Sequence, residues 1–197
     1  MEKAHTKMLE QMLKEFYQNG CGVLGKVDER EMTHATDTIL QAKKIYVLGI
    51  GHSGFFGRIF AMKLNHVGLR AYTVFDEINP PFDQDDLFIA ISQSGGTKTI
   101  LALAEKSKKL GGNVLAVTSK RDSVLGRFAD AALVIDRVDE TVEYDMLSKI
   151  GDLQNQNFLG AIFGFNIYIL FYTIIIMLAE RLGESADSIN ARHANLQ

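Results

Sequence analysis

Five short, uninterrupted apolar runs constrain the fold of this 197-residue chain more than any other feature. Because polar and apolar residues do not alternate within them, each run is expected to be a strand of a parallel sheet buried on both faces. Stretches with helical spacing lie between the runs, which predicts a doubly wound α/β fold with right-handed crossovers. The expected strands are Ile45–Ile50, Ala71–Phe75, Leu87–Ser92, Val114–Thr118 and Ala132–Ile135.

The remaining segments complete a three-layer α/β/α sandwich of the flavodoxin-like kind, with a five-stranded parallel sheet. Two charged, amphipathic helices are expected first, and Gly20 and Gly22 are expected to end the earlier one. No repeat or linker interrupts the chain, so residues 1–197 are expected to form a single domain. The expected helices are Glu2–Asn19, Asp28–Lys43, Gly54–Val67, Thr97–Leu110, Asp122–Phe128 and Glu184–Ala194, with a polar loop at Arg137–Asp152.

Composition excludes several classes of function. The chain is 47% apolar and 23% charged, with a net charge of −3 and no basic run, so no nucleic-acid partner is expected. Cys21 is the only cysteine, which excludes an intrachain disulfide. The histidines show no metal-ligand spacing, and we expect neither a metal nor a cofactor. The first 18 residues lack the apolar core of a signal peptide, which predicts a cytoplasmic protein.

One late segment is unusually apolar. No charged residue occurs from Leu153 to Ala179, and the stretch Phe158–Ala179 is long enough to span a bilayer. A helix that is apolar all round is either a membrane span or is buried on every side. We favour a helix buried between the sheet and another subunit, hence no membrane and a homo-oligomer.

Two loops carry the functional argument. Gly49–Gly54 (GIGHSG) follows the first strand, and Ser92–Thr97 (SQSGGT) follows the third. In this sheet type, ligands bind beyond the carboxyl ends of the strands. Each loop has small residues that admit an anion to backbone N–H groups, carries hydroxyls, and opens a helix. We therefore predict a cradle for the phosphate of a small molecule, formed by Gly51, Ser53, Gly54, Ser92, Ser94 and Thr97.

A dinucleotide site is the main alternative. Gly49, Gly51 and Gly54 satisfy G-x-G-x-x-G, and the acids Asp76 and Glu77 follow the second strand. However, a dinucleotide fold does not need the second hydroxyl-rich loop, and five strands leave no room for a catalytic domain. The chain also lacks the G-x-x-x-x-G-K-[ST] motif of an ATP-binding P-loop.

With these loops placed, the sequence resembles the sugar isomerase (SIS) domain family, and most closely the 6-phospho-3-hexuloisomerases. The resemblance implies a homotetramer that interconverts 3-hexulose 6-phosphate and fructose 6-phosphate. It also implies that the hydroxyls of Ser53, Ser92, Ser94 and Thr97 hold the phosphate. The segments that carry the resemblance are GIGHSGFFGRIFAMKLNHVG (Gly49–Gly68), INPP (Ile78–Pro81), DDLFIAISQSGGTKT (Asp85–Thr99) and RHANLQ (Arg192–Gln197).

Three positions depart from the family pattern. His52 stands where members usually carry arginine, and Lys98 where they often carry glutamate. Members also have a glutamate at the start of the long helix, in a segment like MGxLFE. The matching LGAIFGFN (Leu159–Asn166) places Gly164 at or next to that position, and the whole segment contains no carboxylate.

Shifting a carbonyl along a sugar chain needs a base that takes a proton from carbon. With the usual carboxylate missing, His193 in the terminal RH motif is the predicted catalytic base, acting across a subunit interface. Side chains that could contact the sugar are His52, Arg58, Asp76 and Glu77. Two functions stay open: a phosphosugar isomerase, which we favour, and a phosphosugar-binding protein that has lost catalysis and senses a metabolite.

Overall fold

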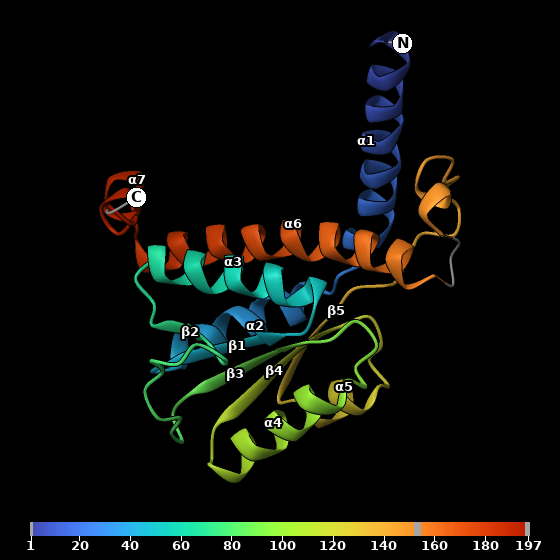
Figure 1. Cartoon of the computed structure of the whole chain (residues 1–197). Helices are drawn as coiled ribbons and strands as arrows, with labels where there is room; N and C mark the ends of the chain where they lie inside the picture. The colour runs from blue at the N-terminus through green and yellow to red at the C-terminus, as the bar shows by residue number, and fades with distance from the viewer. Residues whose placement is uncertain (1, 152–154, 196–197) are drawn as a thin grey trace.

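The computed structural model describes residues 2–151 and 155–195, and a five-stranded sheet lies at its centre (Figure 1). The strand order is β2-β1-β3-β4-β5, and every neighbouring pair is parallel. The predicted parallel sheet is therefore confirmed. Its strands are β1 (Ile45–Gly49), β2 (Ala71–Thr73), β3 (Leu87–Ile91), β4 (Asn113–Thr118) and β5 (Ala131–Val134).

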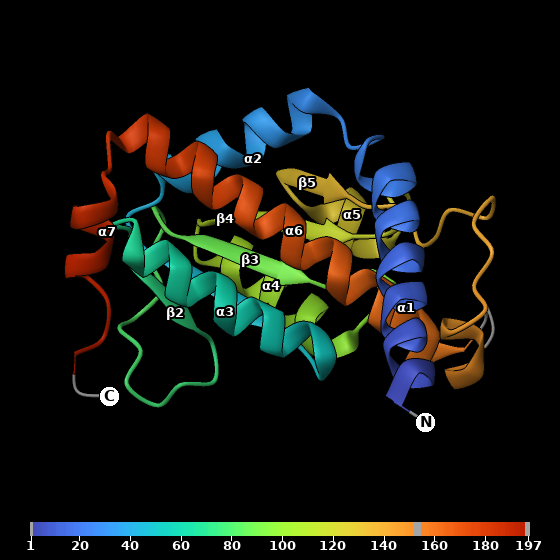
Figure 2. The ribbon, with the colours of Figure 1, turned by 90° about the horizontal axis from the view of Figure 1, so that it is seen from above.

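Helices cover both faces of the sheet, as predicted for a three-layer sandwich. Figure 2 shows α2 (Glu29–Gln41), α3 (His52–His66) and α6 (Gln156–Leu182) side by side over one face. The opposite face carries α4 (Lys98–Lys109) and α5 (Val124–Phe128) (Figure 1). Two separate apolar cores result, one on each face of the sheet.

The long apolar helix α6 packs on the first of these cores. By length and composition, Asn157–Leu182 could cross a membrane, but 56% of its most apolar 18-residue stretch is buried inside the structure. Phe171 of α6 stacks on Phe60 of α3 with ring centroids 4.2 Å apart. Burial against α3 and the sheet accounts for the apolar residues on the inner side of α6. Its outer side still exposes Ile169 (40%) and Ile176 (58%).

The first helix is longer than predicted. Helix α1 runs over Glu2–Leu24, so the prediction that Gly20 and Gly22 end it is wrong. Tertiary packing explains Gly22, because a Cβ there would collide with Asp139, whereas a Cβ at Gly20 would make an ordinary contact with Phe165 of α6 at 3.6 Å. Helix α1 stands away from the body of the sandwich, across the start of α6 (Figures 1 and 2).

The predicted polar loop after β5 contains a short 3-10 helix, η1 (Leu147–Ile150). The buried carboxylate of Glu15 on α1 accepts hydrogen bonds from the N–H groups of Met146 (2.7 Å) and Leu147 (2.9 Å). Met12 of α1 also packs against the apolar cluster that contains Leu147 of η1. The loop is thus fastened to α1, an arrangement that local sequence did not reveal. Its last predicted residue, Asp152, lies outside the described residues.

Candidate functional site

The two candidate loops leave neighbouring strands at the same edge of the sheet. Gly49, the last residue of β1, is the register partner of Ile91, the last residue of β3. Because β2 lies on one side of β1 and β3 on the other, the chain reverses direction across the sheet between β1 and β3. Such a switch point is where open α/β sheets bind their ligands. The fold therefore brings the two loops together as the sequence predicted.

Glycines shape the first loop into a tight strand-to-helix turn. Gly51 has φ +60°, and a Cβ at Gly49 would lie 2.6 Å from the backbone of Ser53. The N–H of Gly54 donates to the carbonyl of Gly51 at 3.0 Å, so it is already engaged within the turn. Helix α3 begins at His52, two residues earlier than predicted, which places His52 and Ser53 at its open end.

The second loop carries hydroxyls in a defined arrangement. The Oγ atom of Ser92 and the Oγ1 atom of Thr97 are 2.9 Å apart and share a hydrogen bond. Ser92 is buried, Thr97 is half-buried and Ser94 is exposed, so the hydroxyls run from the sheet edge to solvent. Gly95 between them has φ +63°, and a Cβ there would collide with Ser123 at the start of α5.

Both loops lead into helices that no side chain caps. Gly51 precedes α3 and Thr97 precedes α4, and neither N-cap makes a side-chain hydrogen bond to its helix. By contrast, side chains of the N-cap residues accept hydrogen bonds at the starts of α2, α5, α6 and α7 (Ala186–Ala191). The N-termini of α3 and α4 can therefore offer backbone donors and a positive dipole end to one anion.

Three polar residues missed by the sequence reasoning hold the second loop in place. The carbonyl of Gln93 accepts hydrogen bonds from the hydroxyls of Ser119 (2.7 Å) and Thr118 (3.2 Å). The side-chain amide of Gln93 donates to the carbonyl of Leu159 on α6 at 3.2 Å. The hydroxyl pair at the end of β4 was the available signal, since that strand ends at the same sheet edge.

A pocket of about 280 Å³ adjoins the first loop, on the β2 side of β1. It is lined by Gly51, Gly54 and Arg58, together with Thr73 at the end of β2. The Arg58 guanidinium lies 3.2 Å from a carboxylate oxygen of Asp76, whose other oxygen accepts a hydrogen bond from the Thr73 hydroxyl. Arg58 and Asp76 are thus partnered with each other beside this pocket.

The other acidic candidate, Glu77, is exposed in the segment after β2. Among the described residues, no group of three or more His, Cys, Asp or Glu side chains is arranged to hold a metal ion.

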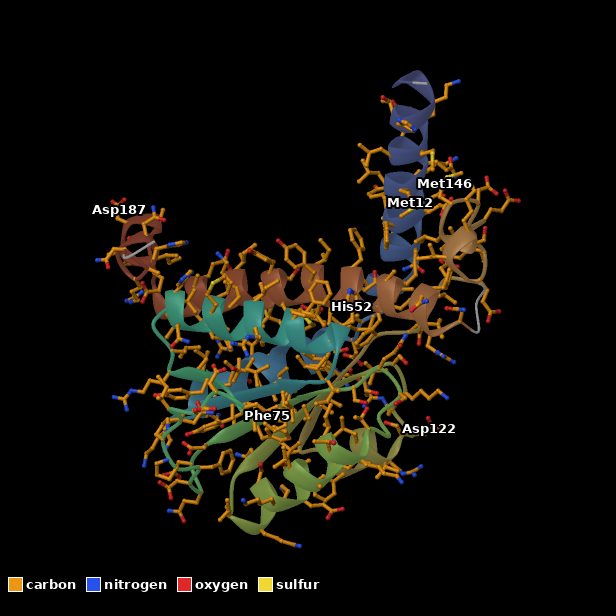
Figure 3. The ribbon with its side chains drawn as sticks, viewed as in Figure 1. Met12, His52, Phe75, Asp122, Met146 and Asp187 are labelled. Carbon is orange, nitrogen blue, oxygen red and sulfur yellow. The ribbon has the colours of Figure 1, made fainter. Side chains whose placement is uncertain are left out.

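The two candidate histidines lie at opposite ends of α3. His52 is its first residue, and the imidazole meets Phe56 edge-on between α3 and α6 (Figure 3). His193 packs instead on His66, the last residue of α3, with ring centroids 4.7 Å apart. Since α3 has 15 residues, its ends are about 21 Å apart. Within one subunit, His193 does not join the two loops.

Arg192, the other residue of the terminal RH motif, is held by hydrogen bonds to neighbouring residues. Arg192 makes two hydrogen bonds to the carboxylate of Glu184, of 2.7 and 2.9 Å, and donates to the carbonyl of His66 at 3.2 Å. The bond to His66, with the packing of His193 on the same residue, fastens the C-terminal segment to the end of α3. Burial lowers the pKa of His66, and the charges of Lys63 and His193 lower it further.

The fold and the two loops define a doubly wound α/β domain with a glycine-rich loop and a hydroxyl-rich loop at the β1–β3 switch point. Residues 38–152 match the SIS domain family, which is more than half of the chain. The chain therefore belongs to the SIS domain family, and the resemblance seen in the sequence is confirmed.

Named relatives span nearly the whole chain. The 3-hexulose-6-phosphate isomerase of Methanocaldococcus jannaschii is 31% identical, over 94% of this chain and 91% of its own length. That of Bacillus subtilis is 30% identical over 98% of both chains. A crystal structure of a hypothetical protein from Methanococcus jannaschii, described as inferring a 3-hexulose-6-phosphate isomerase function, matches with a TM-score of 0.70. It is 28% identical and covers 100% of both chains.

Proposed function

We propose that this chain is a phosphosugar isomerase that interconverts 3-hexulose 6-phosphate and fructose 6-phosphate. The observation that carries the proposal is the pair of helix starts, α3 and α4, whose N-cap residues make no side-chain cap. They follow neighbouring strands through a glycine-rich loop and a hydroxyl-rich loop. Two relatives that match at 30% identity or more carry the name of this activity. Residues 1–197 would act as one SIS domain, with no metal or cofactor needed for a proton shift.

The loops would bind the phosphate end of the substrate. The hydroxyls of Ser53, Ser92, Ser94 and Thr97 would donate to its oxygens, and the dipoles of α3 and α4 would favour its charge. The sugar carbons then extend away from the sheet edge. The pocket beside Gly51 and Arg58 offers room on one side, and His52 with the start of α6 lies on the other.

A phosphosugar-binding protein without catalysis is the second candidate. The observation that favours it is Gly164, which leaves no carboxylate at the start of α6 where the resemblance implies a glutamate. Such a protein would keep the loops and bind a sugar phosphate as a signal.

An NMR assay separates these candidates. The chain is mixed with 3-hexulose 6-phosphate, and the appearance of fructose 6-phosphate is followed in the carbon spectrum. Turnover supports the isomerase. Clear thermal stabilisation by a sugar phosphate, with no turnover of any member of a panel, supports the binding protein.

The Ser53→Ala/Ser94→Ala variant tests the loops themselves. We expect it to lose stabilisation by sugar phosphates, while Ser148→Ala on η1, an exposed serine that belongs to neither loop, keeps it. Unchanged binding by the double variant would overturn the assignment of the loops.

We also propose that the protein is a cytoplasmic homo-oligomer, a tetramer by the resemblance. Helix α1 exposes Met8, Leu9, Leu13 and Tyr17, with between 47% and 70% of each residue accessible. The outer side of α6 adds Ile169 and Ile176. A second copy would cover this apolar area and would allow His193 to approach a neighbouring site. A monodisperse monomer by light scattering in detergent-free buffer would refute the oligomer.

A further inference from the structure

The imidazole of His52 occupies the space that a side chain at position 164 would need. A Cβ built on Gly164 of α6 would lie 2.5 Å from Cε1 and 3.0 Å from Nδ1 of His52. It would also lie 2.6 Å from Cε2 of Phe56. Van der Waals contact needs about 3.5 Å or more between carbon atoms, so even a methyl group at this position would displace the ring. A glycine at 164 is what allows His52 to lie against α6.

Two aromatic contacts define the position of the ring. His52 meets Phe56, one turn further along α3, at a centroid distance of 5.0 Å and an interplanar angle of 90°. Phe56 in turn packs edge-on against Tyr168 of α6 at 6.1 Å. The imidazole is therefore held between α3 and α6 while remaining open to solvent on its outer side. Figure 3 shows His52 at this junction.

The position of the His52 imidazole beside the loops suits it to act on a substrate that the loops hold. His52 is adjacent to Ser53 in the chain and belongs to the same turn as Gly51. A phosphate held by Ser53 would sit on one side of this turn, and α6 lies on the other. The carbons that react in a keto shift lie three and four carbons from the one that bears the phosphate. A substrate held at its phosphate end therefore presents them to groups beside the loops rather than within them.

We propose that the His52 imidazole, lodged against Gly164, is the group that carries the proton between C2 and C3 of the substrate. This proposal rests on the proposed function. It assigns the base to the residue that fills the space at position 164, where the carboxylate suggested by the resemblance is absent. Histidine is suited to this exchange because its imidazole nitrogen can accept a proton and return it.

The step balances within the substrate. Neutral His52 takes the proton from C2, and the electrons of that C–H bond form the C2=C3 double bond while the C3 carbonyl electrons move to O3. The proton on O2 passes to O3. The electrons of the double bond then take the proton back from the imidazolium at C3, and C2=O forms. C2 is oxidised and C3 is reduced in one molecule, so no other reactant is needed.

Substitution at His52 tests the role directly. His52→Gln keeps a side chain of similar size that cannot accept and return a proton. We expect kcat to fall by roughly 10²- to 10⁴-fold. KM and thermal stabilisation by fructose 6-phosphate should change by less than about threefold, because the phosphate contacts remain. A drop in affinity with kcat preserved would overturn the proposal.

The variants Gly164→Ala and Gly160→Ala on α6 form a matched pair of test and control. Gly164→Ala should displace the imidazole and lower kcat by about tenfold or more. Gly160→Ala lies one turn earlier, where a Cβ would be 3.9 Å from Nδ1, an ordinary contact, and should leave kcat unchanged. Both substitutions raise helix propensity, but a Cβ at Gly164 also meets Phe56 at 2.6 Å. Thermal unfolding of both variants therefore accompanies the comparison, and kcat is compared only between folded proteins.

The double variant His52→Gln/Gly164→Ala completes the cycle. If Gly164 acts only through His52, the double variant is no slower than His52→Gln alone. Additive losses, or a His52→Gln enzyme as fast as the unaltered chain, would overturn the role of His52 while leaving the proposed function in place. An unaltered chain without turnover would overturn both.

Discussion

The hydroxyl oxygens of Ser92 and Thr97 lie 2.9 Å apart, joining the end of β3 to the start of α4. Thr97 occupies the N-cap position of α4 but does not use its side chain to cap the helix. Its hydroxyl is instead directed toward the neighbouring serine. The pair can turn outward to an anion that approaches the helix start, which makes this contact the most informative place to perturb the loops.

Thr97→Val removes the hydroxyl and keeps the shape of the side chain. A hydrogen bond to a charged group contributes about 1.5–3 kcal/mol. The Kd for fructose 6-phosphate should therefore rise by roughly 10- to 100-fold in isothermal titration calorimetry. Thr33→Val serves as the control, because its exposed hydroxyl donates to the carbonyl of Glu29 on α2, away from the loops. Equal affinities of the two variants would contradict the role of Thr97.

Gly95→Ala should destabilise the protein. Gly95 has φ +63°, a conformation that costs other residues about 1–2 kcal/mol. The new methyl group would also displace Ser123, whose side chain caps α5. Urea unfolding should show a loss of at least about 1 kcal/mol. Gly96→Ala, with its Cβ 3.9 Å from Ser94 and no positive φ, should be close to neutral. The reverse order of stability would show that the loop is not held as described.

Gly22→Ala should weaken the attachment of α1. A Cβ at this position would push Asp139 away and disturb the hydrogen bonds that its carboxylate accepts from Thr141. In Gly20→Ala the new Cβ would make an ordinary contact with Phe165 at 3.6 Å. The protein should therefore gain up to about 1 kcal/mol of stability from helix propensity. Hydrogen exchange of residues 139–150 should rise in Gly22→Ala alone. Equal protection in both variants would contradict the packing of α1 on this segment.

Stability should fall in mildly acidic solution because of His66. Burial, Lys63 and His193 all lower its pKa in the folded protein. Below the ordinary histidine pKa of about 6.5, the unfolded chain takes up a proton that the folded chain binds less readily, so unfolding becomes more favourable as pH falls. The contribution of neutral His66 to the free energy of unfolding is therefore fully present above a pH of about 6.5. It is lost as the pH falls from there toward the lowered pKa of His66.

Thermal unfolding between pH 7.5 and 5.5 measures this effect. The melting temperature of His66→Phe should fall less over this range than that of the unaltered chain, whereas His34→Phe, at an exposed position on α2, should follow the unaltered chain. Parallel pH curves for all three proteins would exclude His66 as the source.

Local sequence patterns were enough to predict the sheet and its helical layers. Continuous apolar runs identify buried parallel strands, and the glycine and hydroxyl residues after β1 and β3 mark the loops because their spacing is local. Family resemblance added the expected sugar phosphate. The positions of Ser53 and Thr97 at helix starts therefore follow from the order of residues along the chain.

Contacts between distant segments were not accessible in this way. Gly20 and Gly22 have the local signature of a helix end, but α1 continues through both to Leu24, and Asp139 packs closely against Gly22. The bond from Gln93 to Leu159 joins residues 66 positions apart, which no periodicity reports. The His52 ring lies in the space that a side chain at position 164 would need. This contact depends on how α3 and α6 pack, and only the three-dimensional arrangement reveals it.

A crystal structure with fructose 6-phosphate tests the central claim most directly. We predict the phosphate at the β1–β3 edge, within hydrogen-bond distance of the hydroxyls of Ser53, Ser92, Ser94 and Thr97, with the sugar carbons directed toward His52. A phosphate bound elsewhere, or one held at this edge without any of the four hydroxyls, would contradict the account.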